Sequence, residues 1–99
     1  MITYEVTANV DAALASTYEE YMTTRHLRDV LATGCFVEAV LERAGSGNYR
    51  ARYVARTRDD VDRYLREHTT ELRADFAARF PTGVRLSREI WTEESRLAR

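Results

Sequence analysis

Three side chains in this 99-residue sequence belong to types that carry out chemistry near neutral pH: the two histidines, His26 and His68, and the one cysteine, Cys35. The ordinary pKa of histidine lies close to neutrality, so His26 is the candidate general acid or base. Both histidines fall in late turns of predicted helices, where a cation meets the negative end of the helix dipole, so a capping or packing role is the competing interpretation. Cys35 follows a helix end, where the dipole disfavours a thiolate, and we expect a small, partly buried residue.

Neither the histidines nor the cysteine form a recognisable catalytic or metal-binding pattern. A zinc site needs three or four ligands, and Cys35 with two distant histidines does not supply them. The sequence therefore predicts no metal site and no cofactor, and it identifies no catalytic residue.

A second set of polar side chains shares one property: its members alternate with apolar residues along strand-like segments. Polar groups that converge on a concave sheet can bind a small polar or anionic ligand, and the competing interpretation is a face that is solvated or buried in a dimer. The candidate ligand-binding residues are Glu5, Thr7, Asn9, Arg50, Arg52, Ser87 and Glu89.

The elements that must position these residues are read from the spacing of apolar side chains. Residues 2–10 alternate with a period of two, which is typical of a half-buried strand. Asp11 is a candidate N-cap for a helix of about five turns, in which apolar residues recur at helical spacing until Gly34 ends it. Strands are predicted over 36–43 and 49–56, joined by a hairpin loop at 45–48.

The second half of the chain repeats the helix–strand order. Thr57 and Asp60 resemble a capping box with Asp in place of Glu, and they precede a helix that Thr69 and Thr70 are expected to divide in two. Pro81 and Gly83 close this segment. A last strand is predicted over 84–91, so residues 1–91 form one domain and residues 92–99 a polar tail.

This order predicts an α+β, ferredoxin-like β-α-β-β-α-β sandwich: a four-stranded antiparallel sheet, with strands one and three central and both helices on one face. Glu5 can then lie opposite Arg50 or Arg52. On the other strands of the open face we expect Phe36, Glu38, Val40, Arg85 and Trp91, with Val37 on the apolar face. Arg88 faces the apolar side by alternation and is expected to reach past the helix edge to a carboxylate.

Composition argues against several classes of partner. The chain has 15 basic and 16 acidic residues, so it lacks the basic excess typical of proteins that bind nucleic acid or anionic membranes. No apolar run approaches the length of a membrane span, and no signal peptide is recognisable, so we expect a cytoplasmic protein. RNA binding would require exposed aromatic residues, and Tyr49 and Tyr53 would supply them only if the two sheet faces were assigned the other way round.

Three stretches carry a family resemblance: residues 2–7, residues 26–36, and residues 72–75 together with Arg79 and Phe80. They resemble an uncharacterised bacterial family of about this length, a domain of unknown function in the dimeric α/β-barrel superfamily. The resemblance implies the ferredoxin-like fold and a homodimer whose sheets face each other. It brings no known activity; relatives in the wider superfamily include cofactor-independent monooxygenases, haem-degrading enzymes and muconolactone-isomerase-like enzymes.

Three functional hypotheses remain open at this point. The first is a homodimeric module that binds a small molecule on or beneath the open sheet face. The second is a structural or protein-interaction module without a ligand. The third, suggested by the superfamily alone, is a cofactor-independent oxygenase- or isomerase-like enzyme.

Overall fold

The first strand, β1 (Ile2–Val10), lies at the centre of the four-stranded sheet in the computed structural model, which describes residues 1–99. The strand order is β2-β3-β1-β4, with β2 spanning Glu38–Arg43, β3 Asn48–Ala55 and β4 Val84–Thr92. All three neighbouring pairs are antiparallel. The predicted central position of the first and third strands is confirmed.

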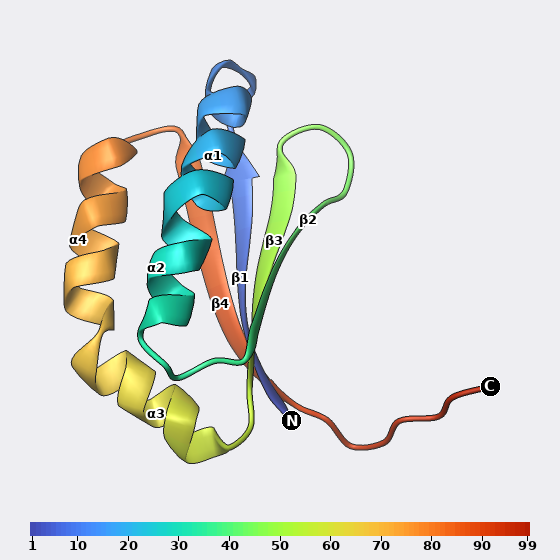
Figure 1. The fold of residues 1–99 in the computed structure, drawn as a ribbon. Helices are drawn as coiled ribbons and strands as arrows, with labels where there is room; N and C mark the ends of the chain where they lie inside the picture. The colour runs from blue at the N-terminus through green and yellow to red at the C-terminus, as the bar shows by residue number, and fades with distance from the viewer.

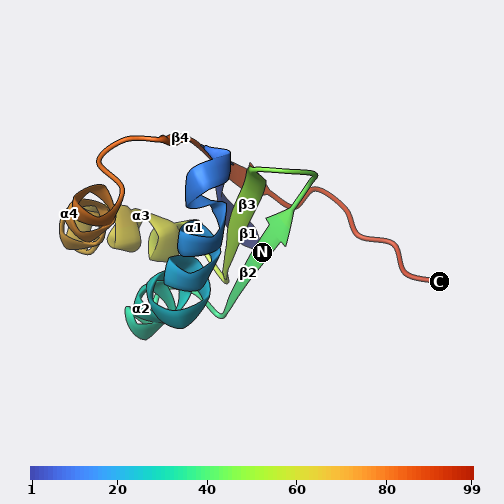
Figure 2. The same ribbon diagram turned by 90° about the horizontal axis from the view of Figure 1, so that it is seen from above.

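The helices all lie on one side of the sheet (Figures 1 and 2). The first crossover contains α1 (Ala15–Tyr21) and α2 (Leu27–Ala32), and the second contains α3 (Arg58–Glu67) and α4 (Thr69–Arg79). The other face of the sheet carries no helix. The ferredoxin-like fold is therefore confirmed, and its open face is the surface on which the seven candidate polar residues were predicted.

The first helical segment is less regular than its apolar spacing predicts. It opens with a 3-10 turn at Ala12–Leu14, and a π-helical turn at Met22–His26 separates α1 from α2. Thr23 and Thr24 donate hydrogen bonds to the carbonyl oxygens of Glu19 and Glu20 at 2.7 and 2.6 Å. These side-chain bonds satisfy carbonyl groups in the widened turn, where the regular helical ladder is interrupted.

Two predictions about this segment need correction. Asp11 occupies the predicted N-cap position, but its carboxylate makes no capping hydrogen bond and pairs instead with Arg85 at 2.9 Å. His26 does not lie in a late helical turn, because the π-helical turn places it in the middle of the helical segment. The helix dipole therefore does not explain His26, whereas His68 does lie at the end of α3.

The second helical segment follows its prediction closely. The backbone N–H of Asp60 donates to the Thr57 hydroxyl at 3.1 Å, which caps α3. The helix is interrupted at His68, next to Thr69 and Thr70, where the break was predicted. The second helix of the segment, α4, begins at Thr69. The break turns α4 into a new direction, as Figure 1 shows.

Tyrosines dominate the core between the sheet and the helices. Tyr4, Tyr49 and Tyr53 point inward from β1 and β3, and Tyr18 and Tyr64 meet them from α1 and α3; each is at most 5% exposed. Tyr49 and Tyr53 are therefore buried, so β3 offers no aromatic platform on which RNA bases could stack.

The start of β2 differs from the prediction. The strand begins at Glu38, and the two residues before it belong to the connection from α2. Phe36, predicted on the open face, is instead buried against Tyr64 with ring centroids 4.9 Å apart, and Val37, predicted on the apolar face, is 43% exposed. The two assignments are wrong because the strict alternation of a strand does not extend into the connection.

The chain leaves the sheet at Thr92, where β4 ends. Residues 93–99 contain no helix or strand and are exposed, and Figure 1 shows them running away from the sheet. No helix has both the length and the apolar character needed to cross a membrane. The division at residue 91 and the cytoplasmic setting stay predictions.

Candidate functional site

The open face carries the seven predicted polar residues on three adjacent strands. Glu5 lies opposite Arg52 of β3 and Glu89 of β4, and Thr7 lies opposite Arg50 and Ser87 in the same way. Asn9 follows two residues later on β1, on the same face. The alternation of the sequence thus places all seven on one face of the sheet, and the strand register decides which of them lie opposite each other.

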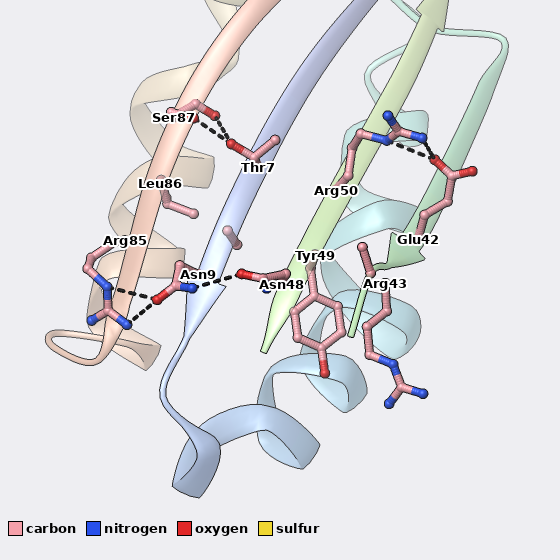
Figure 3. Close-up of a pocket in the computed structure, with 12 residues that line it drawn as sticks. Thr7, Asn9, Glu42, Arg43, Asn48, Tyr49, Arg50, Arg85, Leu86 and Ser87 are labelled. Carbon is pink, nitrogen blue, oxygen red and sulfur yellow. Dashed lines mark hydrogen bonds and ion pairs between the residues drawn. The ribbon is translucent and has the colours of Figure 1, made fainter. Parts of the chain in front are cut away.

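A broad hollow of about 680 Å³ opens on this face (Figure 3). Thr7, Asn9, Arg50 and Ser87 line it, together with residues that the sequence analysis did not select, notably Asn48 and Arg85. Asn9 forms hydrogen bonds with both Asn48 and Arg85. Its side-chain amide donates to Asn48 Oδ1 at 2.8 Å, and its own Oδ1 accepts from Arg85 Nη2 at 2.5 Å.

Most polar groups of the open face are already paired with each other. Arg50 bonds Glu42 of β2 at 2.8 Å and lies 3.4 Å from Glu5. Thr7 and Ser87 share a hydrogen bond across β1 and β4. The bond from Arg50 lowers the pKa of the Glu42 carboxyl below its usual value, so this pair stays charged at neutral pH. A ligand in the hollow would have to displace these partners.

The other end of the open face is more apolar. Val40, Val54 and Trp91 lie there beside Arg52 in a second hollow of about 430 Å³. Trp91 is 53% exposed, and its indole N–H donates to Glu5 at 2.9 Å. Glu5 is thereby held between Trp91 and Arg50, and its side chain is only 13% exposed.

A third cavity, which we call the interlayer pocket, lies on the opposite side of the sheet, beneath the helices. Its volume is about 300 Å³, at the lower end of the range typical of small-molecule sites (~300–1,000 Å³). Six of its fifteen lining residues are tyrosines or phenylalanines, and Leu72, Leu86 and Val84 are among the aliphatic members. The rings are those of Tyr4, Tyr18, Tyr53, Tyr64, Phe76 and Phe80.

His26 is the first of three polar groups in this wall. Its Nδ1 atom is buried and has no hydrogen-bond partner, while its ring stacks on Tyr21 at 5.7 Å and meets the edge of Phe76 at 5.9 Å. Burial lowers the pKa of the imidazole below its ordinary value, although the carboxylates of Asp29 and Asp75 oppose this shift. The imidazole is therefore neutral at pH 7, with a nitrogen free to accept a proton or a hydrogen bond.

Arg73 of α4 and Arg88 of β4 are the other two polar groups of the interlayer pocket. Neither forms an ion pair with any carboxylate of the chain, whereas Arg25, Arg50 and Arg85 all do. Arg88 does face the helix side as its alternation predicts, but the predicted carboxylate partner is absent. Arg73 contacts the hydroxyl of Tyr4 at 3.4 Å.

The interlayer pocket could not be predicted from the sequence because its lining residues have the composition of an ordinary core. One signal was available: several inward-facing aromatic residues are tyrosines, whose hydroxyls require polar surroundings or water. The charged side chain of Arg88 on an otherwise apolar strand face was a second signal.

The remaining reactive groups form no site of their own. Cys35 is 2% exposed, and its thiol lies 3.9 Å from the Thr33 carbonyl oxygen. Its predicted role as a small buried residue is consistent with this position. No three His, Cys, Asp or Glu side chains lie close enough together to hold a metal ion.

Comparison with known proteins places these features in a family. Residues 1–93 match the family described as Domain of unknown function (DUF4286). The chain belongs to this family. That membership agrees with the resemblance seen in the sequence, and the family's description assigns no activity. No curated protein matches the chain.

One solved structure shares the fold over nearly its whole length. It is the crystal structure of a point mutant of SnoaB, a cofactor-independent oxygenase from Streptomyces nogalater. The similarity covers 99% of this chain and 97% of that chain, with a TM-score of 0.70 and 22% sequence identity. At this identity the comparison establishes the fold and leaves the reaction open.

Proposed function

We propose that the protein binds a small, largely apolar molecule in the interlayer pocket. The observation that carries this proposal is the wall of the pocket itself, in which aromatic rings line a cavity of about 300 Å³ together with an imidazole whose Nδ1 atom has no hydrogen-bond partner and two guanidinium groups that form no ion pair. Ligand sites typically combine apolar walls with a few convergent polar groups in this way.

The hollow on the open face is larger but supports binding less well. It is open to solvent, and hydrogen bonds and ion pairs within the chain already occupy most of its polar groups. A ligand there would exchange existing bonds for new ones, with little net gain. The small polar ligand predicted for this face stays a prediction, and unchanged binding and pairing in Arg52→Ala would count against it.

The pocket proposal can be tested with the uncharged fluorescent probe N-phenyl-1-naphthylamine, whose emission rises in apolar surroundings. We expect saturable binding that is lost in Ala77→Phe, because Ala77 lines the pocket and a benzyl group there would fill it. Ala78→Phe is the matched control, since Ala78 is the next exposed residue of α4 and lies outside the lining. Equal binding by both variants would refute the proposed site.

We also propose that two copies pair through their open faces. The apolar strip of Val40, Val54 and Trp91 gives that face a surface to bury, and its interspersed Glu and Arg side chains can be complementary to a second copy of themselves. A pair would have a mass near twice the 11.5 kDa of the chain.

Light scattering coupled to size-exclusion chromatography measures this mass directly. Val40→Asp places a charge in the apolar strip and should yield a monomer. Val37→Asp is its control, because Val37 is exposed and lies outside the strands. A monomer for the unaltered protein, or a dimer for Val40→Asp, would contradict pairing through the open face.

A second candidate function is an enzyme that removes a proton from its ligand, with His26 as the general base. The buried Nδ1 atom of His26 has no hydrogen-bond partner, and its lowered pKa keeps the imidazole unprotonated at neutral pH; both observations favour this candidate, and the shared fold of the oxygenase SnoaB suggests molecular oxygen as a co-substrate. The protein should then catalyse oxygen uptake, measured with an oxygen electrode, when it is given hydroxynaphthalenes that bind the pocket. His26→Gln should abolish this uptake. Tight binding without oxygen uptake by any of them would reject this candidate.

A further inference from the structure

Arg73 and Arg88 approach the interlayer pocket from opposite layers of the fold. Arg73 comes from α4 and places its Nη2 atom 3.4 Å from the Tyr4 hydroxyl. Arg88 comes from β4, where it lies beside Val6 of β1 on the face turned toward the helices. Both residues line the same cavity and both remain exposed to solvent.

Tyr64 of α3 connects the two arginines electrostatically. Burial raises the pKa of its hydroxyl and the nearby Tyr4 adds to the rise, while the positive charges of Arg73 and Arg88 oppose it. Both guanidinium groups therefore lie within electrostatic range of the Tyr64 hydroxyl, which lines the same pocket. No carboxylate of the chain pairs with either one, although nine other arginines lie within 4.0 Å of a carboxylate.

We propose that the ligand of the interlayer pocket is a small aromatic acid, whose ring lies among the tyrosines and whose carboxylate is bound by Arg73 and Arg88. This inference rests on the function proposed above and specifies the class of molecule for the same site.

The chemistry of the two ends of the pocket supports this class of ligand. Offset or edge-on contacts with aromatic walls favour a flat ring over a branched aliphatic chain. A guanidinium group binds a carboxylate through two parallel N–H···O bonds, and such charge-assisted bonds are stronger than those between neutral groups. A cationic ligand would be repelled by the two charges, and a neutral ligand would form no ion pair with either.

The test compares two molecules of nearly the same shape, 2-naphthoate and 2-naphthylmethanol, as competitors of bound N-phenyl-1-naphthylamine at pH 8. We expect naphthoate to bind at least tenfold more tightly than the alcohol, which corresponds to about 1.4 kcal/mol. The ratio of the affinities for naphthoate and for the alcohol should fall toward one in the double variant Arg73→Gln, Arg88→Gln. Arg28→Gln is the control, because Arg28 is an exposed residue of α2 that has no ion pair and does not line the pocket.

The outcomes separate the two levels of the proposal. Displacement by both competitors with equal affinity would overturn the aromatic acid while leaving the ligand pocket intact. An acid preference that survives in the double variant would also overturn it, because the charge would then be recognised elsewhere. Failure of the uncharged probe to bind at all would overturn the pocket and the acid together. An acid preference lost in the double variant and kept in Arg28→Gln would support both.

Discussion

The Tyr21 hydroxyl provides a quantitative test of how α4 is held over the interlayer pocket. It donates a hydrogen bond of 2.6 Å to Asp75 of α4, and the other oxygen of that carboxylate lies 2.7 Å from Arg25. Tyr21 is the residue before the π-helical turn at Met22–His26, and Arg25 lies within that turn. The three residues therefore tie this turn to α4. Tyr21→Phe removes the hydroxyl and leaves the ring packing unchanged.

The expected loss of stability follows from the partners of the bond. A hydrogen bond to a charged group contributes about 1.5–3 kcal/mol to the free energy of unfolding. The Asp75 side chain is 34% exposed and keeps its pairing with Arg25, so water can replace part of what is lost. We therefore expect the lower end of that range, about 1.5 kcal/mol, or a fall in the melting temperature of about 6–12 °C for a domain of this size.

Urea unfolding followed by far-ultraviolet circular dichroism measures the difference. Tyr18→Phe is the matched control, because Tyr18 is 1% exposed and its hydroxyl donates no hydrogen bond to the chain, so its cost should stay within about 0.5 kcal/mol. Arg25→Ala should cost about 0.2–1 kcal/mol, as expected of an exposed ion pair. Equal stabilities for Tyr21→Phe and Tyr18→Phe would show that the bond to Asp75 contributes nothing and refute this reasoning.

Three further predictions use the same unfolding assay. Gly45→Ala should cost about 1 kcal/mol, because its φ of +73° disfavours a side chain while the space around it is open. Gly47→Ala should cost about 2 kcal/mol or more, because its Cβ would lie 2.5 Å from the Val10 carbonyl oxygen; equal costs would contradict this contact. Stability should fall steeply as the pH rises above 10, where the unfolded chain loses protons that the folded chain keeps, since burial raises the pKa of Tyr18, Tyr53 and Tyr64; each contributes up to about 1.4 kcal/mol per pH unit. Stability should also fall as the pH drops below 6.5, where the unfolded chain takes up a proton that buried His26 resists, and His26→Gln should reduce this acid-side loss; an unchanged loss would exclude His26 as its source.

Local periodicity explains why so much of the fold could be predicted from the sequence. The alternation of residues 2–10 and 49–55 sets which side chains face the helices, and the tyrosines at 49 and 53 are buried as that alternation requires. The cap at Thr57 and the break near Thr69 depend on residues a few positions apart. The pairing of Glu5 with the arginines of β3 follows once the strand order is known.

The features that escaped prediction depend on distant parts of the chain. The interlayer pocket exists because α4 and the sheet leave space between them, and its lining residues come from both crossovers and three strands. Arg88 lacks a carboxylate because none of the neighbouring elements places one within reach. The burial of Phe36 depends on how the connection from α2 enters the sheet, and no local period governs a connection of that kind.

The π-helical turn at Met22–His26 also has a consequence for the evolution of the family. Such a turn contains one residue more than a regular helix of the same course, so deleting one residue there would restore an unbroken α-helix. Each residue of an α-helix turns the chain by roughly 100°, so in a regular helix Tyr21 and Val30, nine positions apart, would lie on opposite sides, and the extra residue of the π-helical turn is what lets both face the core. Homologues that lack one residue in this segment should therefore keep both core positions on an unbroken α-helix, one residue closer together in the sequence.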